Sequence, residues 1–218
     1  MSPTESSHEK VENILRKEWR VVPEQPDEIR ATVLERFSET ALTPEQVKTF
    51  PLGPDSAKSL GYDAEEIDVL PSSVTESFCG VGNPLGLGEL QAGQIVLDLG
   101  SGSGMDSILA ARRVGRSGKV VGVDMTEAMI EKARSNAAVV SLSNIEFIQT
   151  EIDRLPLDDE SVDVAITNGV FNLCPDKRKV LAKVFRVLRP GGRLQMADIL
   201  LHDDVTPEEV ATKGSWSD

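Results

Sequence analysis

The segment Ile95–Gly104 constrains the fold more than any other part of this sequence. It is an apolar run that contains Asp98 and continues into three glycines at alternate positions, Gly100, Gly102 and Gly104. A second apolar run, Lys119–Val123, is followed directly by Asp124. Together they predict the first two strands of a nucleotide-binding α/β domain, because the glycines allow a tight turn and close approach of a ligand. An acid after the second strand can accept hydrogen bonds from both hydroxyls of a ribose.

The spacing of the glycines separates two kinds of nucleotide site. A dinucleotide site has the pattern G-x-G-x-x-G. Counted from Gly100, its last glycine would fall on Met105, so this pattern is absent. The pattern present, D-x-G-x-G-x-G, resembles motif I of class I S-adenosylmethionine-dependent methyltransferases. The resemblance implies a turn shaped for a sulfonium amino acid and an adenosine. The motif alone also fits a structural strand-turn unit without a ligand.

From Gln94 onward the sequence alternates between strand-like and helix-like patterns. This alternation is typical of a parallel sheet covered by helices on both faces. We expect a three-layer, Rossmann-like α/β sandwich with a mostly parallel sheet. The expected strands are Ile95–Leu99, Lys119–Val123, Ile145–Ile148, Val162–Thr167 and Arg193–Leu200. The turn Arg189–Gly192 is expected to stop the last helix before the fifth strand.

The chain is expected to divide into a helical N-terminal appendage, residues 1–77, and an α/β domain, residues 78–218. Helical spacing of apolar residues predicts helices over Val11–Trp19, Ile29–Phe37 and Asp63–Leu70 in the appendage. Methyltransferases of this class add a helix and a hairpin after the fifth strand, and the segment Leu201–Asp218 has only one short helical stretch. We therefore expect a domain truncated after an exposed fifth strand, which invites pairing into a homodimer.

Composition excludes several classes of partner. The formal net charge is −13 without a Lys/Arg block, so nucleic acid is not an expected substrate. Two cysteines cannot form a disulfide framework. The sequence has neither a secretory signal pattern nor an apolar run of membrane length. These features predict a cytoplasmic protein that does not bind membranes and acts on a small molecule.

Further segments follow the order of motifs in the methyltransferase family. The segment after the third strand resembles the family's adenine loop, which assigns the exocyclic amine to Glu151 and a ring nitrogen to the backbone of Ile152. Asn168 follows the fourth strand, where open α/β sheets bind ligands. The resemblance implies S-adenosylmethionine as cofactor, with Asp98 and Gly100 at its methionine portion and Asp124 at its ribose. The expected cofactor site is completed by Ser101, Gly102, Gly104 and Met125.

Four segments are similar to those of arsenite methyltransferases: Gly61–Asp63, Cys79–Pro84, Val120–Arg134 and Asn168–Leu173. The resemblance implies a thiol-bound metalloid as acceptor, because trivalent arsenic is soft and binds thiolates. Cys79 matches one thiol position of the family. The next position falls on Gly169, and Cys174 is the candidate substitute. Both cysteines are predicted as catalytic residues, and no resident metal is expected.

Three alternatives stay open at this point. Either cysteine is equally compatible with a small buried packing residue. The acceptor could be a carbon or oxygen atom of a small molecule, as in quinone or natural-product methyltransferases. The chain could also bind the cofactor without turnover, as a regulator or an incomplete fragment.

Overall fold

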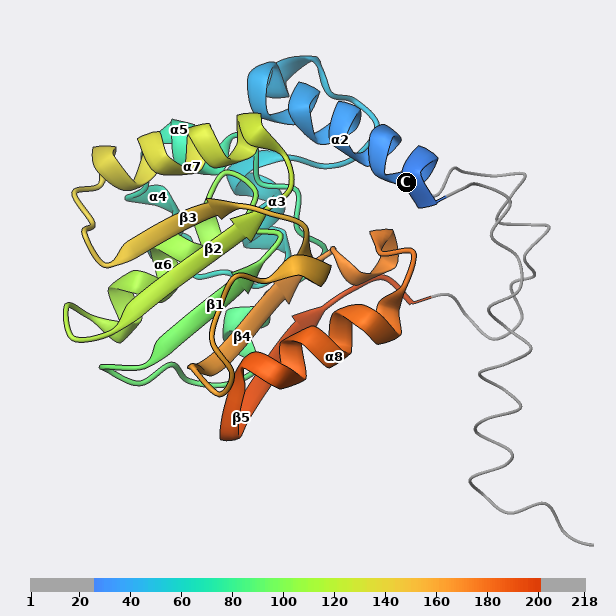
Figure 1. Cartoon of the computed structure of the whole chain (residues 1–218). Coiled ribbons are helices and arrows are strands. Elements are labelled where there is room, and N and C mark those ends of the chain that lie inside the picture. The colour runs from blue at the N-terminus through green and yellow to red at the C-terminus, as the bar shows by residue number, and fades with distance from the viewer. Residues whose placement is uncertain (1–25, 201–218) are drawn as a thin grey trace, which may run out of the picture.

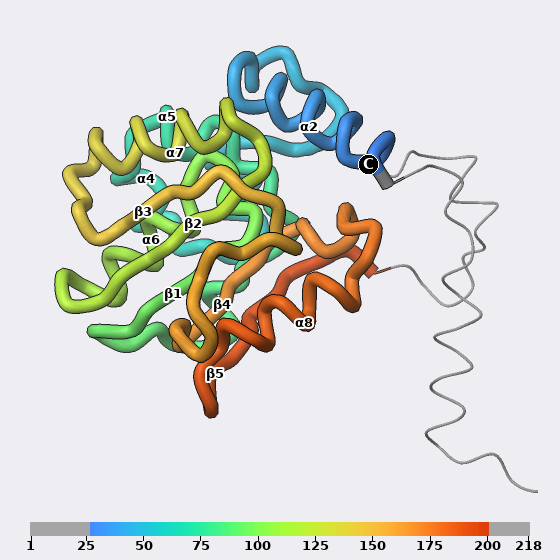
Figure 2. Tube along the Cα trace, viewed as in Figure 1, coloured from blue at the N-terminus to red at the C-terminus, as the bar shows by residue number. Residues whose placement is uncertain are grey.

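The computed structural model describes residues 26–200, which form a five-stranded parallel sheet with helices on both faces (Figure 1). The strand order is β3-β2-β1-β4-β5, so the first strand lies in the middle (Figure 2). The chain places β2 and β3 on one side of β1 and then crosses to the other side for β4 and β5. The strands are β1 (Ile95–Leu99), β2 (Lys119–Asp124), β3 (Ile145–Gln149), β4 (Val162–Asn168) and β5 (Leu188–Ala197). The predicted fold class is confirmed.

Alternate residues of the central strands pack into two separate hydrophobic clusters. On one face, Val96 of β1 and Ile166 of β4 pack with the helix α6 (Met105–Val114). On the other face, Leu97 and Leu99 pack with the helix α8 (Lys177–Val187). The period of two arises because successive side chains of a strand point to opposite faces of the sheet. Burial on both faces explains why these strands are continuously apolar in the sequence.

The helix α7 (Glu127–Val139) covers the β2–β3 side of the face that carries α6. Its buried residues Ile130 and Ala133 pack with Phe147 of β3. The helix α2 (Pro26–Leu42) packs against α7 beyond the carboxyl ends of the strands (Figure 1). Lys132 of α7 supports this packing by donating to the carbonyl of Ala41 at 3.0 Å. The helix predicted over Ile29–Phe37 is therefore present, and it extends beyond both predicted ends.

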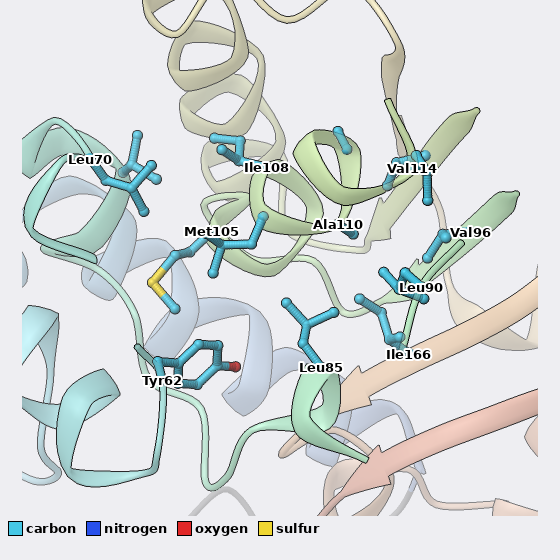
Figure 3. Packing of buried hydrophobic residues seen from close by; sticks show 14 of the residues in the cluster. Tyr62, Leu70, Leu85, Leu90, Val96, Met105, Ile108, Ala110, Val114 and Ile166 are labelled. Atoms are coloured by element: carbon cyan, nitrogen blue, oxygen red, sulfur yellow. The ribbon is translucent and has the colours of Figure 1, made fainter. Parts of the chain in front are cut away.

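The segment between α2 and β1 consists of short elements, and from α3 onward they share the core of the sheet. They are η1 (Pro44–Gln46), α3 (Gly53–Ser59), α4 (Ala64–Asp68), α5 (Ser72–Thr75) and η2 (Pro84–Gly86). Tyr62, Leu70 and Leu85 of this segment belong to the same cluster as Met105 of α6 (Figure 3). The expected appendage thus packs onto the domain through a common core. Its boundary at residue 77 stays a prediction.

The fifth strand differs from its predicted bounds. It spans Leu188–Ala197 rather than Arg193–Leu200, and α8 ends one residue before it. Leu188 pairs with Val162 and Arg193 pairs with Val164, so the predicted turn Arg189–Gly192 is a bulge in the ladder. Pairing with β4 ends at Ala197, opposite Asn168, because β4 itself ends there. Within the described sheet β5 lies at an edge, as predicted.

Two short 3₁₀ helices connect the later elements. They are η3 (Ile152–Arg154) after β3 and η4 (Phe171–Leu173) after β4. The helices predicted over Val11–Trp19 and Pro207–Thr212 lie outside the described residues. Between residues 26 and 200, none of the helices combines the length and apolar character needed to cross a bilayer.

Candidate functional site

The predicted cofactor residues gather at one edge of the sheet. The strands are parallel, so their carboxyl ends meet there, and each of β1, β2 and β3 has an acid within two residues of its last residue. These acids are Asp98, Asp124 and Glu151. Asn168 is the last residue of β4 at the same edge. The structure therefore brings together the residues that the sequence assigned to the cofactor, and their binding roles stay predictions.

The turn after β1 has the backbone that its glycines predict. Gly100, Gly102 and Gly104 have φ values of +69°, +51° and +91°, a region that residues with a Cβ rarely adopt. A Cβ at Gly100 would lie 2.4 Å from Val170 Cγ2. A Cβ at Gly102 would meet only Met129 Sδ within 4 Å, at 3.9 Å. The backbone is thus close-packed at Gly100 and accessible at Gly102.

Asp124 supports this turn from β2. Its carboxylate accepts hydrogen bonds from the backbone N–H of Gly102 at 3.0 Å and of Thr126 at 2.8 Å. Burial raises the pKa of Asp124, and these backbone hydrogen bonds act in the opposite direction. The Thr126 side chain and the backbone N–H of Met125 also favour the charged form of Asp124. Met125, the next residue, accepts from the Gln149 side chain at 3.4 Å.

Asp98 lies at the base of the site and is almost fully buried. It accepts a hydrogen bond from the Ser107 hydroxyl at 2.6 Å. Burial, together with the nearby charge of Asp106, raises the pKa of Asp98 to about 8. Among the ion pairs of residues 26–200, none includes Asp98 or Asp124. A cation at this edge would therefore meet buried carboxyl groups that no described ion pair neutralises.

A buried polar network that the sequence did not predict adjoins Asp98. The Tyr62 hydroxyl donates to Asp106 Oδ1 at 2.6 Å, and Asn168 Nδ2 lies 3.1 Å from Asp106 Oδ2. Burial raises the pKa of Asp106, although the hydrogen bonds from Tyr62 and Asn168 lower it. The position of Asp106, an acid in the helical turn that follows the glycines, was the available signal. Tyr62 lies in the segment Gly61–Asp63, whose similarity to arsenite methyltransferases assigns no role to this residue.

The loop after β3 is held by ion pairs from two helices. Arg30 of α2 lies 3.1 Å from Glu151 Oε2 and 3.5 Å from Asp153, and Lys179 of α8 lies 2.7 Å from Asp153. The Arg30–Glu151 pair lacks hydrogen-bond alignment, so Glu151 Oε2 is a buried oxygen without a hydrogen-bond partner in the described structure. Ile152 begins η3 and packs against the hydrophobic cluster beneath α8.

The two cysteines have different surroundings. Cys79 lies in the irregular segment before η2, within the electrostatic reach of Asp124 and Arg36. Burial raises its pKa to about 12, with Asp124 acting in the same direction. Cys174 follows η4 and its thiol lies 3.4 Å from the carbonyl of Val170. Burial raises the pKa of Cys174 to about 11, against the opposing effect of Lys177.

Both thiols are free, and no contact within residues 26–200 joins them. Within residues 26–200, the His, Cys, Asp and Glu side chains form no group of three or more that could hold a metal ion. The charge of Asp124 acts on the pKa of Cys79, whereas Cys174, directly after η4, is influenced by the charge of Asp198. The described structure thus provides separate thiols rather than a preformed multidentate thiol site.

Comparison with known proteins agrees with this geometry. The family model described as "Methyltransferase domain" matches residues 90–216. The arsenite methyltransferase of Halobacterium salinarum is 46% identical over 144 residues, which is 66% of this chain and 37% of that protein. The arsenite methyltransferase of Mus musculus is 33% identical over 166 residues, 72% of this chain and 44% of that protein.

Among solved structures, the arsenic(III) S-adenosylmethionine methyltransferase of Chlamydomonas reinhardtii is similar, with a TM-score of 0.52 and 40% identity. The match covers 69% of this chain and 50% of that one. The chain thus spans half or less of the length of these relatives. The predicted family is confirmed. By sequence, fold and motif order, the chain belongs to the methyltransferase domain family and is related to S-adenosylmethionine-dependent arsenite methyltransferases.

Proposed function

We propose that this chain binds S-adenosylmethionine at the carboxyl edge of its sheet and transfers a methyl group to a small acceptor. The observation that supports this most is the set of acids at the ends of three adjacent strands around a left-handed glycine turn. Family membership supports the same cofactor. When bound, S-adenosylmethionine supplies an electrophilic methyl group on a sulfonium cation.

The residues present fit such a cofactor. The open side of Gly102 leaves room beside the backbone of the turn, which a Cβ would fill. Ser101 Oγ and Glu151 Oε2 are buried at this edge without a hydrogen-bond partner in the described structure. Buried polar atoms are rarely left unpaired, so donors or acceptors of a ligand are the natural partners for them. Burial raises the pKa of Asp98 and of Asp124, so a cationic ligand would favour the charged form of both carboxyl groups.

Each residue of the edge has a separate proposed task. Asp124, at the end of β2, accepts the ribose hydroxyls. Glu151 and the backbone of Ile152 hold the adenine, and Arg30 keeps the Glu151 carboxylate at the edge. Asp98 and the turn at Gly100 hold the methionine portion. Placing the two reactants together supplies most of the rate of such a displacement, so no strong general base is required.

Arsenite is the acceptor that we propose. The names of the matched relatives support it, and so do two thiols beside the edge. Each thiol exchanges for a hydroxyl of arsenous acid, forming an As–S bond and releasing water. High thiol pKa values do not oppose this exchange, because the thiol proton leaves with the hydroxyl. The net charge of −13 favours a small neutral acceptor over a nucleic acid.

A small-molecule carbon or oxygen acceptor is the second candidate. It is favoured by the lack of a three-membered group of metal-binding side chains within residues 26–200. One thiol alone binds a metalloid weakly, whereas a planar organic acceptor needs only an apolar wall and correct orientation. The acceptor experiment below distinguishes the two.

Two experiments test the proposed function. The first is calorimetric titration with S-adenosylmethionine, with its demethylated product and with a nicotinamide dinucleotide. Binding of the first two alone is expected, and binding of the dinucleotide alone would overturn the proposal. The second is transfer of a labelled methyl group to arsenite by the wild type, Cys79→Ser and Cys174→Ser. Arsenite is the acceptor if the wild type labels it and either substitution reduces labelling at unchanged cofactor affinity.

A further inference from the structure

The side chain of Asn168 forms a reciprocal pair with the backbone of a segment far away in the sequence. Its Oδ1 accepts from the N–H of Val81 at 2.8 Å and of Gly82 at 3.1 Å. Its Nδ2 donates to the carbonyl of Gly82 at 2.9 Å. A side-chain amide can both accept from and donate to the backbone of one residue in this way. The segment Cys79–Gly82 is thereby attached to the end of β4.

Two glycines allow this segment to lie directly on the sheet edge. A Cβ at Gly80 would lie 2.3 Å from Asn168 Nδ2, and a Cβ at Gly82 would lie 2.7 Å from the Cβ of Ala197 in β5. Real Cβ atoms do not approach other atoms this closely, so side chains at these positions would lift the segment away. The glycines therefore serve close packing rather than flexibility.

The same amide joins the segment to Tyr62 and Asp106. Asn168 Nδ2 lies 3.1 Å from the Tyr62 hydroxyl, which in turn donates to Asp106 at 2.6 Å. The Tyr62 ring packs edge-on against Phe78 at a centroid distance of 5.4 Å, next to Cys79 in the chain. Figure 3 shows the Tyr62 ring beside Met105, at the start of the helix that carries Asp106. The network thus holds both ends of the segment.

We propose that Tyr62, Asp106 and Asn168 are positioning residues that hold the segment Cys79–Gly82 on the carboxyl edge of the sheet. Their effect is to fix Cys79, which directly precedes Gly80, at the end of β4. The link to acceptor binding rests on the proposed function, whereas the positioning itself does not. The network is well placed for this task because it connects four stretches of chain that lie far apart in the sequence.

The chain offers a matched control in Asn83. Its side chain also makes two hydrogen bonds, to the carbonyl of Gly61 at 2.9 Å and from the N–H of Gly86 at 3.1 Å. It follows the same segment but connects it to the N-terminal part and to η2 rather than to the sheet. Asn83→Ala should therefore remove two hydrogen bonds, as many as Tyr62→Phe removes, without releasing Cys79 from the edge.

The experiment measures the rate at which Cys79 reacts with an aromatic disulfide reagent, in a Cys174→Ser background that leaves a single thiol. Labelling is compared among this background, Tyr62→Phe, Asn168→Ala and Asn83→Ala, with circular dichroism confirming that each variant is folded. We expect labelling to be about ten-fold faster in Tyr62→Phe than in the background, and faster still in Asn168→Ala. In these variants fewer hydrogen bonds have to break when the segment opens to expose the thiol. Asn83→Ala should stay within about two-fold of the background.

Equal labelling rates in Tyr62→Phe and Asn83→Ala would overturn the proposal. Tyr62→Phe keeps the ring packing on Phe78, so it remains informative if Asn168→Ala does not fold. Labelling requires neither cofactor nor acceptor. Its failure therefore refutes the positioning network alone, whereas failure of the wild type to bind S-adenosylmethionine refutes the proposed function alone.

Discussion

Ser107 donates its hydroxyl to Asp98 at 2.6 Å, and this bond connects the first turns of α6 to the end of β1. The backbone N–H of Ser107 also favours the charged form of Asp98. Burial outweighs the stabilising effect of both groups on the charged form, so the pKa of Asp98 rises to about 8. Asp98 is therefore mostly protonated at neutral pH in the free protein.

This shift predicts how stability depends on pH. Between the ordinary pKa of 3.8 and about 8, the folded state holds a proton that the unfolded state lacks, so stability falls as pH rises through this window. Asp98→Asn should flatten the slope by up to about 1.4 kcal/mol per pH unit. Urea unfolding across this pH range is the measurement. The control is Asp55→Asn, at an exposed acid on α3, which should keep the wild-type slope. An unchanged slope in Asp98→Asn would contradict the prediction.

Asp124→Asn should weaken binding of S-adenosylmethionine about ten-fold to a hundred-fold, since a hydrogen bond to a charged group contributes about 1.5–3 kcal/mol. Asparagine keeps one oxygen, so part of the support for Gly102 and Thr126 remains. The matched control is Asp163→Asn, because Asp163 also accepts a backbone N–H, from Ile95 at 2.7 Å, but at the opposite end of β1. Calorimetry should show unchanged affinity for that control. Equal affinities of the two variants would refute the role of Asp124.

Gly104→Ala should destabilise the fold by about 2–4 kcal/mol, from left-handed backbone strain and from overpacking. Its φ is +91°, and the new Cβ would lie 2.9 Å from Phe147 Cζ and 3.2 Å from Ala133 Cβ. Gly61→Ala separates the two causes, because Gly61 has φ +89° but no atom within 4 Å of the Cβ position. Thermal or urea unfolding should give a smaller loss for Gly61→Ala. A loss as large as that of Gly104→Ala would assign the whole effect to strain.

The edge strand predicts self-association. β5 lies at an edge of the described sheet, and Met196 on it is 43% exposed. Unpaired edge strands tend to pair with another chain, and a charge on the strand blocks this. Sedimentation velocity should show a concentration-dependent dimer that Met196→Lys abolishes. Val139→Lys, at a 61% exposed residue at the end of α7, should leave the dimer intact. A monomer at all concentrations would contradict the expectation.

The sequence predicted those parts of the molecule that depend on neighbouring residues. The bounds of β1 and the left-handed turn after it followed from Ile95–Gly104, because strand pattern and glycine conformation are local properties. The bounds of β5 were wrong, since its pairing is set by β4 rather than by its own apolar run. The Tyr62–Asp106–Asn168 network was missed because its members lie up to 106 residues apart in the sequence.

The central place of β1 in the sheet has a consequence for how the chain becomes functional during synthesis. β1 emerges first, but one of its two neighbours in the sheet is β4, which ends at Asn168. A nascent chain released only as far as η3 already contains Asp98, Asp124 and Glu151, but it lacks the partner strand and the amide that attaches Cys79–Gly82. The segment Cys79–Gly82 therefore cannot be fixed at the edge of the sheet until the fourth strand has been added.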